Sequence, residues 1–70
     1  MDISLKVYVI FSGYDRGVME IFTNLPSAQS YAKKHWPLST EVDHGDGPHY
    51  IGNGGFTYGW IGEYEVRNNQ

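Results

Sequence analysis

The sequence predicts an α+β domain: a small antiparallel sheet of three or four strands with one helix packed on one face, in the element order ββαββ. Three patterns support this prediction. Residues 5–12 and 56–66 alternate with the period of two that is typical of strands, and residues 24–37 repeat apolar side chains every three or four positions, as a helix does. An Asn-Gly pair at 53–54 indicates a hairpin. Residues 1–70 are therefore expected to form a single domain.

The first predicted strand, LKVYVIFS at 5–12, is rich in β-branched and aromatic residues. One of its faces is apolar throughout and carries Leu5, Val7, Val9 and Phe11. The other face is also largely apolar, so we expect the strand to be central in the sheet. A short loop over 13–17 leads to a second strand at 18–24, which completes a hairpin.

The helix is predicted over 24–37, with Asn24 as its N-cap and Pro26 in its first turn, where a missing N–H is tolerated. Pro37 should end it near Trp36. Its apolar stripe consists of Leu25, Ala28, Tyr31, Ala32 and His35. A helix of about three turns is marginal on its own in water, so it is expected to dock on the sheet.

The remaining chain is predicted to be a loop over 38–49, with a short extended piece at 40–43, followed by a hairpin. The rings of its last strand all fall on even positions, which predicts that they share one face and point inward beneath the helix. These residues are Phe56, Tyr58, Trp60 and Tyr64. Gly59 and Gly62 would bend or bulge this strand. The polar segment 67–70 is predicted to be a frayed tail.

Composition excludes several classes of function. The net charge of −3, from eight acidic and five basic side chains, argues against direct binding of nucleic acid. The chain has no cysteine, which fits a reducing cytosol, and no apolar run long enough to span a membrane or resemble a signal peptide. We therefore expect a cytoplasmic protein without membrane contact. A chain of 70 residues has a thin core, and oligomerisation is one way in which such a chain can be stabilised.

Neither catalysis nor metal binding is predicted. The segment 43–49 places two histidines and two aspartates close together, but it follows no established ligand spacing, and a solvated turn is the simpler interpretation. Glu63 and Glu65 share one face of a strand, opposite the rings, where an outer surface is expected. No nucleophile motif is present, and no catalytic residue, metal site or cofactor is assigned.

Protein binding remains the favoured class of function, because surplus tyrosine and tryptophan suit protein interfaces. The residues predicted to contact a partner combine aromatic anchors with steering carboxylates: Tyr14, Asp15, Trp36, Glu41, Asp43, Asp46 and Tyr50. Two alternatives stay open. The glycine-rich and aromatic region 50–60 could hold a small ligand such as a nucleotide, and the surplus rings could lie in the seam of a homodimer.

Three stretches, KVYVIFSGYDRG, EIFTNLPSAQSYAKKH and IGEYEV, resemble small bacteriophage-encoded proteins with a β-hairpin, one short helix and a closing strand. Many of those proteins have no known role, and others are inhibitors of host defence complexes, including the anti-CRISPR class. The resemblance implies a stoichiometric binder in the host cytosol that acts by steric occlusion of a host protein or complex. It transfers no functional residue to this chain.

Overall fold

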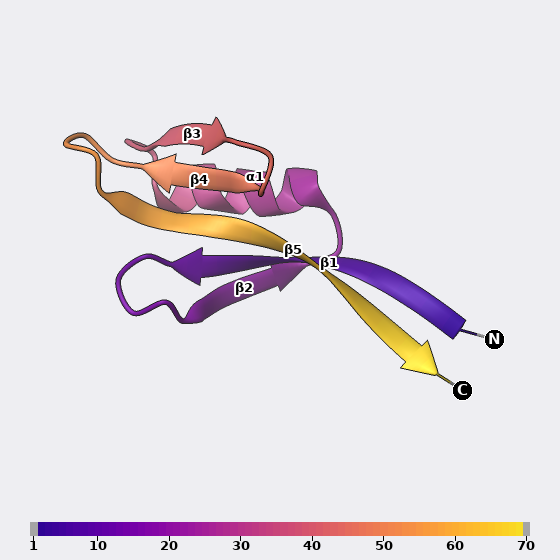
Figure 1. Cartoon of the computed structure of the whole chain (residues 1–70). Helices are drawn as coiled ribbons and strands as arrows, with labels where there is room; N and C mark the ends of the chain where they lie inside the picture. Colours follow the sequence, from indigo (N-terminus) through magenta and orange to yellow (C-terminus); the bar gives the residue numbers. More distant parts are fainter. Residues whose placement is uncertain (1, 70) are drawn as a thin grey trace.

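The computed structural model describes the backbone of residues 2–69 and the side chains of residues 4–67. One antiparallel sheet of five strands carries a single helix on one face (Figure 1). In chain order the elements are β1 (Asp2–Ser12), β2 (Val18–Phe22), α1 (Leu25–His35), β3 (Thr40–Asp43), β4 (Pro48–Ile51) and β5 (Thr57–Asn69). The α+β class is thus confirmed, with β3 as a fifth strand where three or four were expected.

The sheet has the strand order β2-β1-β5-β4-β3, so the first and last strands lie side by side at its centre. They pair along the whole of β1, from Asp2 opposite Asn69 to Ser12 opposite Gly59. β2 pairs only with residues 8–11 of β1, and β4 only with residues 57–60 of β5. The remaining parts, residues 2–7 and 64–69, project as a two-stranded arm, and the molecule measures 48 × 23 × 21 Å (Figure 1).

Helix α1 forms where the sequence predicts it. The side-chain oxygen of Asn24 accepts a hydrogen bond from the backbone N–H of Ser27 at 2.9 Å, and this satisfies one of the unpaired donors of the first turn. Ala28 and Ala32 are fully buried, because small side chains let the helix approach the sheet closely. Among the described residues no helix is long and apolar enough to cross a membrane.

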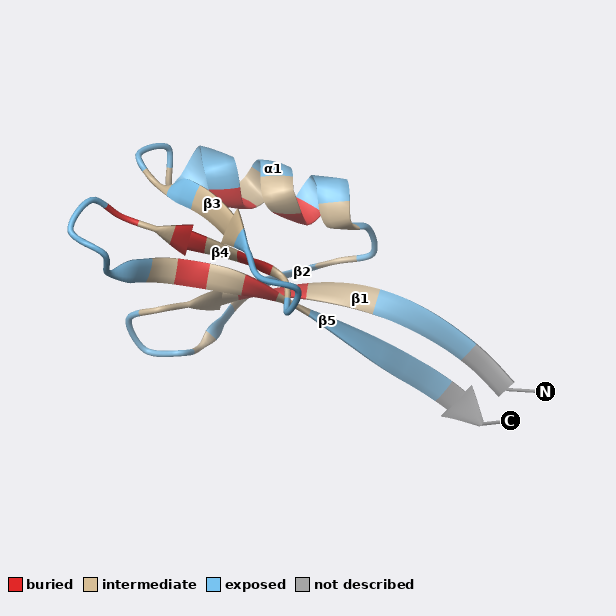
Figure 2. Ribbon diagram, turned by 45° about the horizontal axis from the view of Figure 1, so that its top comes forward, coloured by how far each residue is buried: buried red, intermediate tan, exposed pale blue. Residues whose placement is uncertain are grey.

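The core lies between α1 and the sheet and is small (Figure 2). Its fully buried members are Ile10, Ala28, Ala32, Tyr50 and Ile61. Ile10 and Ile61 are directly opposite each other on β1 and β5, so the even positions of β1 and the odd positions of β5 face the helix.

This register corrects the prediction for the C-terminal rings. Trp60 pairs with Phe11 and Tyr64 with Val7, so both rings lie on the face away from α1. Only Tyr58 packs against the core. The register of β4 and β5 shifts beside this residue, since Ile51 pairs with Thr57, and the resulting bulge turns Tyr58 toward the helix side.

Two local predictions also change. The Asn-Gly pair does not form a two-residue turn, because Gly54 and Gly55 take the positive φ values and the loop closes between the Gly52 N–H and the Phe56 carbonyl. The polar segment 67–70 was predicted to fray. Instead β5 continues through Asn69, paired with β1, and Gln70 lies outside the described residues.

Candidate functional site

The sheet face opposite α1, here called the open face, carries twelve apolar or aromatic side chains, and none of the described elements packs on it. They come from all five strands and are placed by the strand register: Leu5, Val7, Val9 and Phe11 of β1, Val18 and Ile21 of β2, Val42 of β3, His49 and Ile51 of β4, and Trp60, Tyr64 and Val66 of β5. None of the twelve is Asp, Glu, Lys or Arg. The pattern arises because both faces of β1 are apolar while the single helix covers only one of them.

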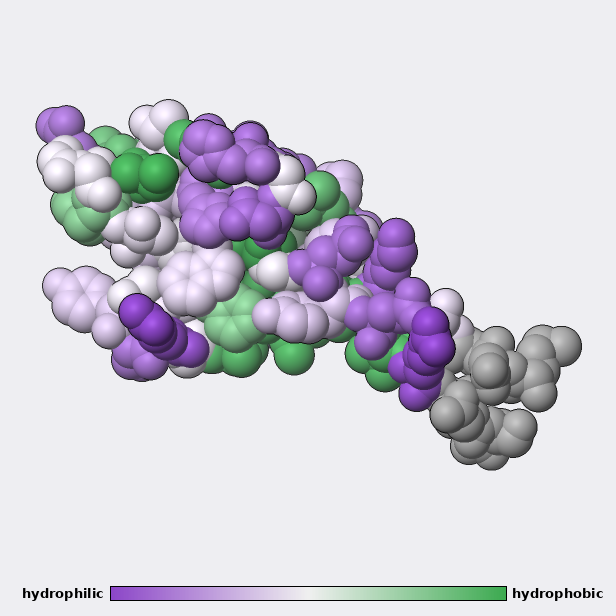
Figure 3. Space-filling model, viewed as in Figure 1, coloured by the Kyte–Doolittle hydropathy of each residue, from purple (hydrophilic) through white to green (hydrophobic). Residues whose placement is uncertain are grey.

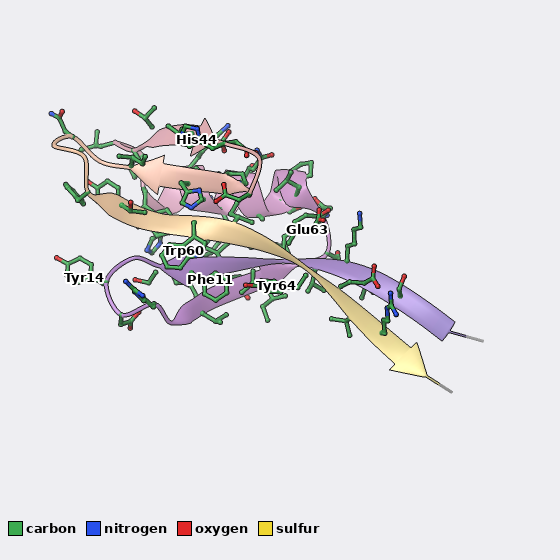
Figure 4. All side chains as sticks on the ribbon, viewed as in Figure 1. Phe11, Tyr14, His44, Trp60, Glu63 and Tyr64 are labelled. Carbon is green, nitrogen blue, oxygen red and sulfur yellow. The ribbon has the colours of Figure 1, made fainter. Side chains whose placement is uncertain are left out.

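Four rings form a row across the centre of the open face. The ring of Phe11 stacks on Trp60 at a centroid distance of 5.4 Å and meets the edge of Tyr64 at 6.2 Å, and His49 stacks on the other side of Trp60 at 6.4 Å. Figure 4 shows Trp60, Phe11 and Tyr64 in this order along the sheet. Stacked and edge-to-face rings hold one another in place, so the row is a preorganised surface.

Much of the open face is accessible to solvent. Leu5, Val18, Ile21, Tyr64 and Val66 are each between 50% and 58% exposed. Figure 3 shows pale and green side chains, of intermediate and high hydropathy, at the centre and lower edge of this side of the molecule, with hydrophilic side chains above them and toward the arm. Continuous apolar surface of this kind is uncommon on a small protein and marks a binding surface or an interface.

The sequence predicted Tyr50 as an exposed anchor for a partner, and the structure places it elsewhere. Its side chain is fully buried, so it cannot serve as an exposed anchor. Its hydroxyl donates a 2.5 Å hydrogen bond to Oε2 of Glu41, whose carboxylate also accepts from Nε2 of Gln29 at 3.4 Å. Glu41 is therefore tied to the core and is not a free steering charge.

The environment of Tyr50 favours the protonated phenol. Burial raises the pKa of Tyr50 far above its ordinary value of 10, and the hydrogen bond and negative charge of Glu41 raise it further. The phenol therefore stays neutral at any physiological pH and acts as a hydrogen-bond donor inside the core.

Replacing Tyr50 with phenylalanine is expected to cost about 1–3 kcal/mol of unfolding free energy at neutral pH, because Glu41 loses a buried donor. Above about pH 10 the unfolded wild-type chain releases this proton while the folded chain retains it. The unfolding free energy of wild type should then fall by up to about 1.4 kcal/mol per pH unit because of this group alone. Tyr50→Phe has no phenol at this position, so its unfolding free energy does not show this decrease. Urea denaturation from pH 8 to 11 should therefore show the gap between the two proteins closing. If the difference in unfolding free energy stays constant over this pH range, Tyr50 is not held as a neutral phenol in the folded protein.

Trp36 is also part of the structure rather than an exposed anchor. Its indole covers Gly59 of β5 and lies 5.8 Å from the ring of Tyr50 and 6.3 Å from that of Tyr58. The side chain is half-buried and closes the core beyond the last turn of α1. Part of the indole remains exposed, so the contact of Trp36 with a partner stays a prediction.

Tyr14 and Asp15 lie in the loop between β1 and β2. Tyr14 is 97% exposed and points away from the body (Figure 4). The Asp15 carboxylate accepts a hydrogen bond from the Gly17 N–H at 2.9 Å and so shapes the loop. Tyr14 has the exposure that an anchor requires, but it stands at the opposite end of the sheet from the acidic segment 43–46.

Asp43 is the last residue of β3, and Asp46 lies in the turn that joins β3 to β4. The Asp43 carboxylate accepts from the Gly45 N–H at 2.8 Å, and Asp46 lies 3.9 Å from the His49 ring nitrogen. With Glu63 they border a pocket of about 380 Å³ whose floor includes Leu25 and Ile61. Within residues 4–67 no three His, Asp or Glu side chains come together as a metal site. The ring of His49 instead stacks on that of Trp60.

The structure brings three of the seven predicted partner residues together, since Tyr50 contacts both Trp36 and Glu41. The seven do not form one exposed surface, and the open face was missed as a surface. The sequence does contain the relevant signal, because both faces of strand 5–12 are apolar while only one helix exists to cover them. Comparison with known proteins adds nothing to this geometry: no family model, curated protein or solved structure matches the chain.

Proposed function

We propose that the protein is a non-catalytic protein-binding module that binds its partner through the open face. The observation that carries this proposal is the row of four rings among half-exposed aliphatic side chains, with no Asp, Glu, Lys or Arg among the side chains of residues 4–67 that the strand register places on this face. Aromatic anchors in an uncharged apolar surround are the usual centre of a protein interface.

The positions of the acidic groups support binding rather than catalysis. Glu41 is engaged by Tyr50 and Gln29, and the carboxylates of Asp15 and Asp43 accept backbone N–H groups of their own turns. These are structural roles. The net charge of −3 and the uncharged face also favour a protein partner over a nucleic acid.

The same features fit the class of partner that the resemblance to phage-encoded inhibitors implies. A rigid, flat apolar face can cover a functional surface of a host protein or complex and exclude its ordinary ligand. The proposed mode of action is steric occlusion in the host cytosol, without turnover. A nucleotide platform made of Tyr58 and Trp60 is not supported, because these rings lie on opposite sides of the sheet.

A variant that places a charge on the open face should abolish partner binding. Val18 is 58% exposed on β2, so Val18→Glu can keep its carboxylate hydrated in the free protein. In the bound state the charge would be desolvated without a pair, which should weaken binding at least about 10-fold. The measurement is quantitative mass spectrometry of proteins retained from host cytosol by immobilised wild type and variant.

The matched control is Ser30→Glu, which adds the same charge at an exposed position of α1, on the other side of the sheet. It should retain the same proteins as wild type. A double charge reversal, Asp43→Lys with Asp46→Lys, tests the acidic turn separately. If this double variant loses the retained proteins while Val18→Glu keeps them, the partner binds at the turn and the open face is not the binding surface.

A further inference from the structure

We infer that a second copy of this chain covers the open face, so that the free protein is a two-fold symmetric dimer in which the two sheets pack face to face. This inference rests on the proposed function, because it names the first protein that occupies the proposed binding surface. An external target would then compete with the second copy for the same rings.

The first argument is electrostatic. Two copies that each carry a net charge of −3 repel one another unless the charges lie away from the contact. On the arm, strand alternation separates the two kinds of side chain completely: Lys6, Glu65 and Arg67 share one face, and Leu5, Tyr64 and Val66 share the other. The apolar side of the arm continues the open face, so a two-fold contact brings no like charges together.

The second argument is the size of the face. The paired length of β1 and β5 is eleven residues, or roughly 35 Å, and the sheet widens to five strands beyond the arm. Packing two such faces would bury on the order of 1,000–1,500 Å² in total, which is the range of a specific interface. Sheets that pack in this way lie about 10 Å apart with their strands nearly aligned, and the ring row would lie at the centre.

The third argument is stability. Among residues 4–67 of the single copy only six hydrophobic side chains are buried, and a chain of 70 residues with so small a core is marginal. The arm adds to the difficulty, because an isolated two-stranded ribbon is marginally stable in water. A second copy would turn the apolar side of both arms and both ring rows into a second core. The second copy is always present at the same concentration as the first, whereas the concentration of an external partner is set independently.

Sedimentation velocity over a wide range of concentrations tests the inference. Wild type should sediment as a dimer that dissociates on dilution. Tyr64→Glu, at a side chain 51% exposed on the open face, should raise the dimer dissociation constant by about 100-fold or more, as loss of an interface hot spot does. Ser30→Glu introduces the same charge at an exposed position of α1, on the other side of the sheet, and should sediment as wild type does.

Circular dichroism establishes that each variant is folded, and Leu5→Glu, at a position 50% exposed on the arm, replaces Tyr64→Glu if that variant is unfolded.

A wild type that is monomeric at every concentration overturns the inference. So does a dimer that Tyr64→Glu and Ser30→Glu weaken equally. If wild type is a monomer and Val18→Glu still loses the captured host protein, the proposed function stands and that protein occupies the open face. If wild type is a monomer and Val18→Glu captures the same proteins as wild type, both the dimer and the proposed function are wrong.

Discussion

Replacement of Tyr50 by alanine is expected to lower the free energy of unfolding by about 3–5 kcal/mol, the cost of truncating a large buried ring. Tyr50 is the largest fully buried side chain, and it contacts Trp36 while its hydroxyl holds the Glu41 carboxylate. The substitution removes packing and a buried hydrogen bond at once. Because small domains are stable by only about 5–15 kcal/mol, much of the chain should be unfolded at 37 °C.

The measurement is chemical denaturation followed by circular dichroism, with Tyr14→Ala as the matched control. Tyr14 is 97% exposed, so the same deletion there should change the unfolding free energy by no more than about 0.5 kcal/mol. Equal effects at the two positions would show that Tyr50 is not in the core and would return it to the set of surface residues.

A second large effect is expected at Gly59, where the bulk added is a single methyl group. The Cβ of an alanine here would overlap the backbone carbonyl oxygen of Phe11 and the indole of Trp36. Neither can move freely, since the first belongs to the neighbouring strand and the second closes the core. Gly59→Ala should therefore lose about 3 kcal/mol of stability, the upper part of the range for overpacking.

Gly17→Ala is the control for this prediction. Its nearest neighbours would be atoms of the exposed Asp15 side chain, which can turn aside, so the change should be small. Thermal unfolding of both variants is a sufficient measurement. A Gly59→Ala protein as stable as Gly17→Ala would mean that Trp36 does not lie over β5, and the packing of the helix end would need revision.

The local elements of the fold could be read from the sequence because short-range chemistry determines them. Asn24 caps α1 by bonding a backbone group three residues away, and Ala28 and Ala32 are buried on the stripe that the helical period predicts. The extended piece at 40–43 is a strand, as expected. These features depend on neighbours in the chain, and a sequence displays such neighbours directly.

The candidate site was harder to predict because it depends on which face of the sheet the helix covers. The alternation of 56–66 placed the rings together, yet the bulge beside Tyr58 turns that residue to the helix side while Trp60 and Tyr64 stay on the other. Tyr50 and Trp36 were expected at the surface because the core was assigned to those rings. Once Ile61 and Gly59 face the helix, Tyr50 and Trp36 become the aromatic part of the core.

By itself the sequence determined that this chain forms an antiparallel sheet with one helix, and that its central strand is apolar on both sides. Only the tertiary structure decided which side stays uncovered. The physical reason is that strand periodicity assigns residues to two faces, but when both faces are apolar it does not indicate which one the helix covers. The choice is made by pairing between distant segments, Ile10 with Ile61 and Phe11 with Trp60, and by where the chain places the helix after β2.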